Sequence, residues 1–301
     1  MKQGLSLIAT IPAIQNYRDV LKVFKCPRIS EVRFNTGSRS PYTSLETVKL
    51  LKEFAEKENK KLWIDIKGRQ LRVDAWADPL YECVELNHPI KVDFPARIAF
   101  RNGSTSQISH VDGNKIFLMK PPREVLGKGQ SVNIIGSTPN ILDGYLTKQD
   151  VLYLEACKEL NVKNIMASFV EQEDDLEEIK KIVGCDAIIC AKIESQKGIG
   201  FIVSHSLQSL MAARDDLFIE LNGNYKMMLE ALKIIITSDP NAICASRIFT
   251  SLERRESPDF SDYEDLEMMY QMGYRRFMLC DNVCNYAFDN AIKAWEEFLD
   301  A

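Results

Sequence analysis

The sequence AIICAKIE at residues 187–194 is a short apolar run that ends in a lysine and a glutamate. A second run, LMAARDD at residues 210–216, ends in an arginine and two aspartates. Short apolar runs bounded by glycine and charge are typical of buried parallel strands. In a barrel of such strands the functional groups gather at the carboxyl ends. The sequence therefore predicts that the two charged clusters face one small space.

Strand-like and helix-like patterns alternate along the chain. The strand-like runs are 5–10, 29–34, 62–66, 165–169, 187–192, 210–214, 242–245 and 276–280, and the helical patterns are 17–24, 44–57, 148–160, 174–182, 225–236, 261–272 and 285–298. This alternation favours a parallel sheet with right-handed crossovers, and eight strands are the number that closes a barrel. We therefore expect an α/β fold, a (β/α)8 TIM barrel formed by residues 1–72 and 137–301. Thr147 and Ser261 are the expected N-caps, and Gly184 and Gly273 are expected just past helix ends.

Residues 73–136, after the third strand, break this rhythm. No long helical pattern occurs there, and Asn102-Gly103 and Asp112-Gly113 are hairpin-type turns. We expect a small inserted β domain, β-barrel-like, that acts as a lid over the open face of the barrel.

Composition excludes several classes of protein. At 301 residues and 46% hydrophobic, the chain can bury a barrel-sized core. The formal net charge is -5 and no basic block stands out, so nucleic acid is not an expected partner. No apolar run approaches the roughly 18 residues of a membrane span, so we expect no membrane partner and a cytoplasmic location. The eight cysteines form no Cys-x-x-Cys pair and the three histidines are isolated, so neither disulfides nor a zinc site are expected.

The charged residues at the ends of the two runs suggest a metal-dependent chemistry. Glu194 and Asp216 offer the carboxylate oxygens that a hard divalent ion prefers. Lys192 would add a second positive charge for a phosphate or for a developing enolate oxygen. The alternative is that each charge only caps a strand and pairs with a neighbour; the two clusters together favour a site.

An ordered set of motifs resembles the pyruvate kinase family over nearly the whole chain. The motifs are AKIES at 191–195, ARDDLFIE at 213–220, ICAS at 243–246, ASFV at 167–170, VRFN at 32–35 and DIKG at 65–68, together with Arg72. The resemblance implies the catalytic residues Lys192 and Ser246, and Glu194 and Asp216 as ligands of Mg²⁺ or Mn²⁺. It implies a substrate- and phosphate-binding set of Arg33, Arg72, Asn35, Asp65, Ser168 and Asp215. Arg214, within its motif, is expected to hold the loop through an acidic partner.

Departures from the family's motifs limit what the resemblance implies. Gly37 and Ile66 stand where two oxygen ligands of a monovalent cation are usual, and Gln70 replaces a glutamate, so a potassium ion is doubtful. Asp215 replaces a glycine, and its charge would oppose an anionic substrate. Residues 280–283 read CDNV where the family has Ser-Gly-Glu-Thr, which leaves ADP or ATP binding least supported. We expect the family's C-terminal regulatory domain to be missing, and we expect a homodimer.

Three functions follow from these observations. The first is phosphoryl transfer between phosphoenolpyruvate and ADP, as in the family. The second keeps the metal and the enolate without the nucleotide, as a Mg²⁺- or Mn²⁺-dependent lyase, aldolase or decarboxylase of a 2-oxo acid. The third is a degenerate barrel that only binds a partner, since a fold does not fix its function.

Overall fold

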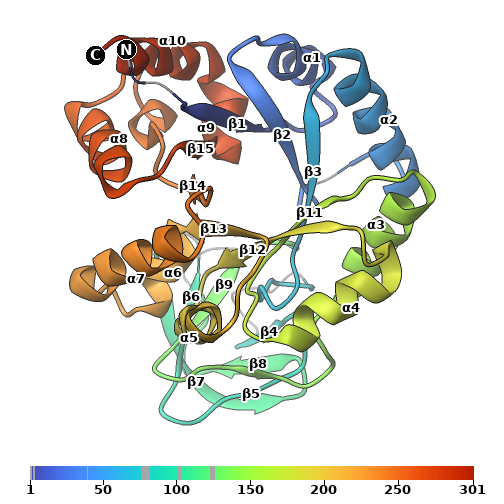
Figure 1. Cartoon of the computed structure of the whole chain (residues 1–301). Coiled ribbons are helices and arrows are strands. Elements are labelled where there is room, and N and C mark those ends of the chain that lie inside the picture. Colours follow the sequence, from blue (N-terminus) through green and yellow to red (C-terminus); the bar gives the residue numbers. More distant parts are fainter. Residues whose placement is uncertain (1, 3, 39, 76–81, 101–102, 123–125) are drawn as a thin grey trace. The chain divides into compact units, whose positions relative to one another are not determined.

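All eight predicted strands are present in the computed structural model, where they form a closed parallel barrel (Figure 1). The model describes residues 2, 4–38, 40–75, 82–100, 103–122 and 126–301. In chain order the barrel strands are β1 (Ser6–Thr10), β2 (Ile29–Asn35), β3 (Lys61–Ile66), β11 (Asn164–Ala167), β12 (Ile188–Ile193), β13 (Ser209–Ala213), β14 (Ile243–Ala245) and β15 (Arg276–Leu279). Around the ring the order is β1-β15-β14-β13-β12-β11-β3-β2, so the first and last strands pair and close the sheet. The predicted (β/α)8 fold is confirmed.

Helices connect these strands and cover the outside of the barrel (Figure 1). They are α1 (Tyr17–Lys25), α2 (Ser44–Lys57), α3 (Lys148–Glu159), α4 (Glu173–Val183), α5 (Gln196–Ser204), α6 (Arg214–Glu220), α7 (Tyr225–Ser238), α8 (Phe260–Met272), α9 (Asp281–Tyr286) and α10 (Phe288–Asp300), with a short 3-10 helix at Thr250–Glu253. Gly184 and Gly273 follow α4 and α8 with positive φ, as predicted. The prediction for Ser261 was wrong, because Asp259 caps α8 in a capping box with Asp262. Within the described part of the chain, no helix has both the length and the apolar character to cross a bilayer.

The interior of the barrel is filled by side chains that alternate along each strand. The register pairs Asn35 with Asp65, Lys192 with Met211 and Thr10 with Arg33, and paired residues in a sheet lie on the same face. One buried cluster on this face consists of Ile8, Trp63, Met166, Cys190, Met211, Ala213, Ile243, Ala245 and Met278. Polar residues follow the apolar ones two positions later, for example Thr10 after Ile8 and Lys192 after Cys190. The packed core therefore changes to a polar layer toward the carboxyl ends of the strands.

A second polar group lies at the opposite, amino-terminal end of the barrel. Glu31 on β2 accepts hydrogen bonds from Arg276 Nη2 at 2.7 Å and from Trp63 Nε1 at 2.5 Å. The Lys61 ammonium lies 4.3 Å from the centre of the Trp63 ring. This group, Glu31, Trp63, Lys61 and Arg276, joins β2, β3 and β15 and leaves its members satisfied.

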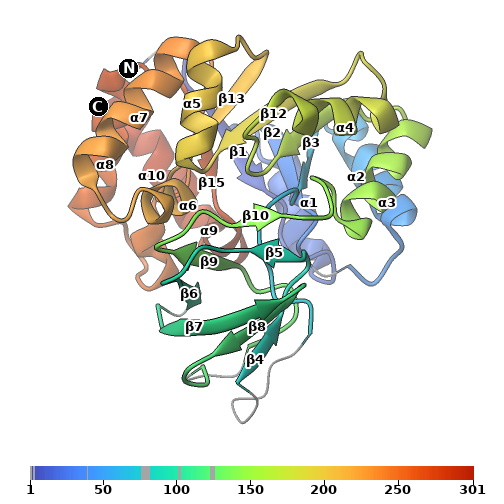
Figure 2. The same cartoon turned by 90° about the horizontal axis from the view of Figure 1, so that it is seen from below.

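The insertion after β3 is an antiparallel unit with a core of its own. Contacts divide the chain into one unit of Met1–Ile66 with Gln149–Ala301 and a second of Lys67–Lys148. The second unit contains a sheet ordered β4-β8-β7-β6-β9 and the pair β10-β5, with bounds β4 (Cys83–Glu85), β5 (Ile90–Lys91), β6 (Arg97–Phe100), β7 (Thr105–Asp112), β8 (Lys115–Leu118), β9 (Val132–Ile135) and β10 (Asn140–Ile141) (Figure 2). Gly113 turns β7 into β8 with φ 59°, where a hairpin turn was predicted; Asn102 lies outside the described residues. The unit is wider than the predicted 73–136.

Candidate active site

The polar layer at the carboxyl ends of the strands is organised around the Lys192 ammonium on β12. Its Nζ lies 3.0 Å from Glu194 Oε1 and 3.6 Å from Asp65 Oδ1, and it donates a 2.7 Å hydrogen bond to Ser168 Oγ. Burial alone lowers the pKa of Lys192, but the Asp65 and Glu194 carboxylates outweigh burial and leave the pKa raised. Lys192 is therefore a buried cation that stays protonated.

Glu194, directly after β12, lies beside this cation, and the charge of Asp216 on α6 acts on both. Glu194 is 1% exposed, and its Oε2 accepts the backbone N–H of Phe169 at 2.7 Å. Burial raises the pKa of Glu194, Lys192 lowers it, and the charge of Asp216 raises it again, so the net direction is upward. This crowding of negative charge is relieved when a cation binds.

A hard divalent ion fits the donor set of Glu194 and Asp216, since both offer carboxylate oxygen. Among the residues that the structure describes, no group of three or more His, Cys, Asp and Glu side chains is arranged to hold a metal. An ion here would therefore take its remaining ligands from water or from a substrate, as Mg²⁺ commonly does.

Arg33 on β2 forms the other cationic part of the layer. Its Nε donates to Asp65 Oδ2 at 2.7 Å, and its Nη1 donates to Thr10 Oγ1 at 3.0 Å and to Asp281 Oδ2 at 3.2 Å. Asn35 Nδ2 donates to the other oxygen of Asp281 at 3.1 Å. Burial lowers the pKa of Arg33, but Asp65 and Asp281 raise it further than burial lowers it. Sequence reasoning missed Asp281, although it did note that the motif around it departs from the family.

Arg214 holds the turn that carries Ser246. Its guanidinium makes two hydrogen bonds to Asp265, at 2.7 and 2.8 Å, and its Nε donates to the Ala245 carbonyl at 3.1 Å. Nη2 donates to the Ser246 carbonyl. Ser246 itself has φ 65°, a left-handed conformation that a non-glycine residue adopts only when its surroundings hold it there. The expected structural role of Arg214 through an acidic partner is confirmed.

We expect Asp265→Ala to lower the free energy of unfolding by about 3 kcal/mol, because it leaves the buried Arg214 charge without its carboxylate. Asp265 is 22% exposed, which puts the expected cost at the lower end of the range for buried pairs. Urea denaturation would measure the change. Asp289→Ala is the control, since Asp289 is 70% exposed in its pair with Lys22 and should cost less than about 0.5 kcal/mol. Equal stability of the two variants would contradict the assigned role of Arg214.

Two predicted substrate-binding residues have hydrogen-bond partners of their own. Asp215 is 56% exposed and accepts a 2.8 Å hydrogen bond from Arg247 Nε, so a cation offsets the negative charge predicted to oppose an anionic substrate. Arg72 belongs to the second unit, where its Nη2 donates to Gln70 Oε1 at 2.7 Å and its Nη1 donates to the Gly129 carbonyl. Within the barrel unit, the structure thus brings together Arg33, Asn35, Asp65, Ser168, Lys192 and Glu194, with the charge of Asp216 acting on the last two.

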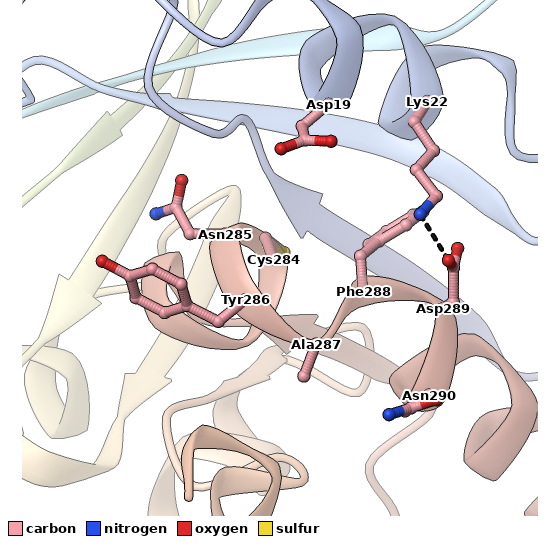
Figure 3. Close-up of a pocket in the computed structure, with 9 residues that line it drawn as sticks. All are labelled: Asp19, Lys22, Cys284, Asn285, Tyr286, Ala287, Phe288, Asp289 and Asn290. Carbon is pink, nitrogen blue, oxygen red and sulfur yellow. Dashed lines mark hydrogen bonds and ion pairs between the residues drawn. The ribbon is translucent and has the colours of Figure 1, made fainter. Parts of the chain in front are cut away.

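A separate cavity of about 290 Å³ lies between α1 and the α9–α10 segment (Figure 3). Its lining includes Asp19, Asn285 and Tyr286, and an ion pair between Lys22 and Asp289 lies at one side of it. None of the predicted site residues lines this cavity.

Comparisons with known proteins agree with this arrangement. The family model described as pyruvate kinase, barrel domain, matches residues 107–285, more than half of the chain. The chain is 27% identical over 150 residues to a pyruvate kinase of Dictyostelium discoideum; the aligned segment covers 47% of this chain and 29% of that protein. It is 30% identical over 152 residues to a pyruvate kinase of Encephalitozoon cuniculi, which covers 48% of this chain and 35% of that protein. The chain therefore matches about a third of the length of these relatives.

Proposed function

Because the chain belongs to the pyruvate kinase family, we propose that it is a divalent-metal-dependent enzyme that stabilises the enolate of pyruvate. Our first choice of reaction is phosphoryl transfer between phosphoenolpyruvate and ADP. The observation that carries the proposal is the buried Lys192 ammonium, within 3.0 Å of Glu194 and hydrogen-bonded to Ser168. A fixed cation in a buried site stabilises a developing oxyanion more than the same charge in water does.

Each residue of the layer has a role in this proposal. Glu194 and Asp216 would hold Mg²⁺ or Mn²⁺, which when bound supplies a Lewis acid to the enolate oxygen. Lys192 lies beside the oxygen that gains charge. Arg33 and Asn35 would bind the phosphoryl group, with Asp65 fixing the Arg33 guanidinium. Ser168 and Ser246 would contact the substrate, and Ser246 would hold its carboxylate and help to protonate the enolate.

The remaining predictions concern other ligands, further substrate contacts, and the assembly and location of the protein. The proposed enzyme has no potassium cofactor, because Gly37 and Ile66 replace two of the oxygen ligands that are usual for that ion in the family. The nucleotide, a phosphate contact of Arg72, a substrate contact of Asp215, the lid role of residues 73–136, the homodimer and the cytoplasmic location stay predictions.

A second candidate function is a Mg²⁺- or Mn²⁺-dependent lyase, aldolase or decarboxylase acting on a 2-oxo acid. The contact of Asp281 with both Arg33 and Asn35 favours it, because a carboxylate already lies where the first candidate needs a phosphoryl group. This reaction requires Lys192, the two metal ligands and one arginine, and no nucleotide.

One assay separates the candidates. Purified protein is given phosphoenolpyruvate with and without ADP, or oxaloacetate and longer 2-oxo acids, each with Mg²⁺ or Mn²⁺ and with a chelator as control. Pyruvate formed from phosphoenolpyruvate only with ADP and metal supports the first candidate. Metal-dependent turnover of a 2-oxo acid alone supports the second, and turnover of neither class would leave the non-catalytic binding role.

A further inference from the structure

Asp281, the first residue of α9, lies against two donors of the candidate anion site. One of its carboxylate oxygens accepts from Arg33 and the other from Asn35, at 3.2 and 3.1 Å. The Arg33 side chain is 8% exposed, whereas that of Asp281 is 35% exposed. Asp281 is therefore the solvent-facing member of the pair, on donors that come from the end of β2.

Asp65 and Asp281 differ in what they do to Arg33. Asp65 is fully buried and takes the Nε side of the guanidinium, so it orients the group from within the barrel. Asp281 takes Nη1, which also donates to the buried Thr10 hydroxyl. Asp65 thus orients the Arg33 guanidinium, whereas Asp281 occupies a donor that an anionic group of a substrate would otherwise use.

The second carboxylate, Asp281, adds to the negative charge that an incoming anion would meet. Asp65 and Asp281 act on Arg33, and Asp65, Glu194 and Asp216 act on Lys192, so carboxylates outnumber cations among these groups. A phosphoryl dianion would then add two further negative charges beside Asp281, whereas a carboxylate would add one, and Coulomb repulsion scales with the product of the charges.

We infer that Asp281 is a specificity-determining residue that makes the Arg33 and Asn35 site select a singly charged carboxylate over a doubly charged phosphoryl group. This inference rests on the proposed function, because it takes Arg33 and Asn35 to be the groups that meet the anion of the substrate. It deepens the second candidate, the reaction of a 2-oxo acid, and opposes phosphoryl transfer, since it names a 2-oxo monocarboxylate as the substrate class that the site accepts most readily.

The test is equilibrium binding of inorganic phosphate and of acetate to the full chain, at pH 8 and at constant ionic strength with Mg²⁺. Asp281→Asn keeps the shape of the side chain and removes its charge. We expect it to tighten phosphate binding by about tenfold or more, and acetate binding by about threefold, because repulsion of a single charge is half as large in free energy. Asp281→Ser, which keeps an oxygen for Arg33, should shift both affinities in the same direction.

Asp289→Asn on α10 is the matched control and should leave both affinities within twofold. Circular dichroism and thermal melting would verify that each variant is folded. A phosphate affinity within twofold of the parent in both Asp281 variants would overturn the inference, and so would an equal gain in the Asp289 variant. The binding measurement needs no turnover. The inference about Asp281 can therefore hold when the activity assay fails, and it can fail when the assay succeeds.

Discussion

Lys192→Met is expected to reduce pyruvate formation by at least about a hundredfold, the loss that follows removal of a preorganised charge at a developing oxyanion. Methionine has nearly the length of lysine and no charge, so the change removes the ammonium while filling most of its space. Divalent-metal affinity should be unchanged or slightly tighter, because Glu194 loses a competing cation 3.0 Å from its Oε1. Initial rates and a calorimetric Mn²⁺ titration measure the two effects separately.

Lys197→Met is the matched control for this experiment. Lys197 lies on α5, its side chain is 56% exposed, and it is 4.0 Å from Glu171, so its replacement should leave the rate within twofold. If Lys192→Met keeps its activity within about tenfold, or roughly 1.4 kcal/mol, the role assigned to the ammonium is wrong.

Glu194→Gln is expected to abolish turnover and to weaken metal binding. The amide removes one of two negative charges, and loss of a direct ligand should weaken Mn²⁺ binding by more than about a hundredfold, beyond the effect of changing an outer partner. The glutamine oxygen can still accept the Phe169 N–H that Glu194 accepts at 2.7 Å, so the local backbone has its partner. Mn²⁺ binding followed by electron paramagnetic resonance, with rates at saturating metal, would check both effects.

Glu177→Gln on α4 serves as the control, since Glu177 is 45% exposed in its pair with Lys180. A Glu194 variant that binds Mn²⁺ as the parent does would show that the ion is held elsewhere. A variant that binds weakly yet regains the full rate at high metal would assign Glu194 to affinity alone.

The strands of the barrel could be predicted from the sequence because both of their faces are buried. Runs such as AIICAKI contain little except apolar residues, which few other structures need over so short a length. The short helices were harder. Gln196–Ser204 contains Gly198 and Gly200, and Arg214–Glu220 starts directly where β13 ends, so neither shows a long helical period. The pattern at 285–298 also concealed a break, since α9 and α10 are separated at Ala287.

The candidate site was predictable where a residue lies on a strand and less so where it lies on a loop. Lys192 and Glu194 follow their strand by alternation, so their shared direction is set by local geometry. The partners of Asp281 and Arg214 are separated from them by 246 or 248 residues and by 51 residues, and no local pattern reports such contacts. The left-handed Ser246 is equally hidden, because the residue is not a glycine and Arg214, which donates to its carbonyl, is 32 residues away in the chain.

The cluster of Glu31, Trp63, Lys61 and Arg276 has a consequence for how this molecule can diverge. Its hydrogen bonds join β2, β3 and β15 at the end of the barrel remote from Lys192. Stability and catalysis therefore depend on different residues of the same strands. Residues at the carboxyl ends of the strands can therefore be exchanged, and the substrate range changed, while the contacts at the amino-terminal end still hold the strands together. A mutant library limited to positions at the carboxyl ends of the strands should yield mostly folded protein. Selection on that library would then act on the reaction and not on stability.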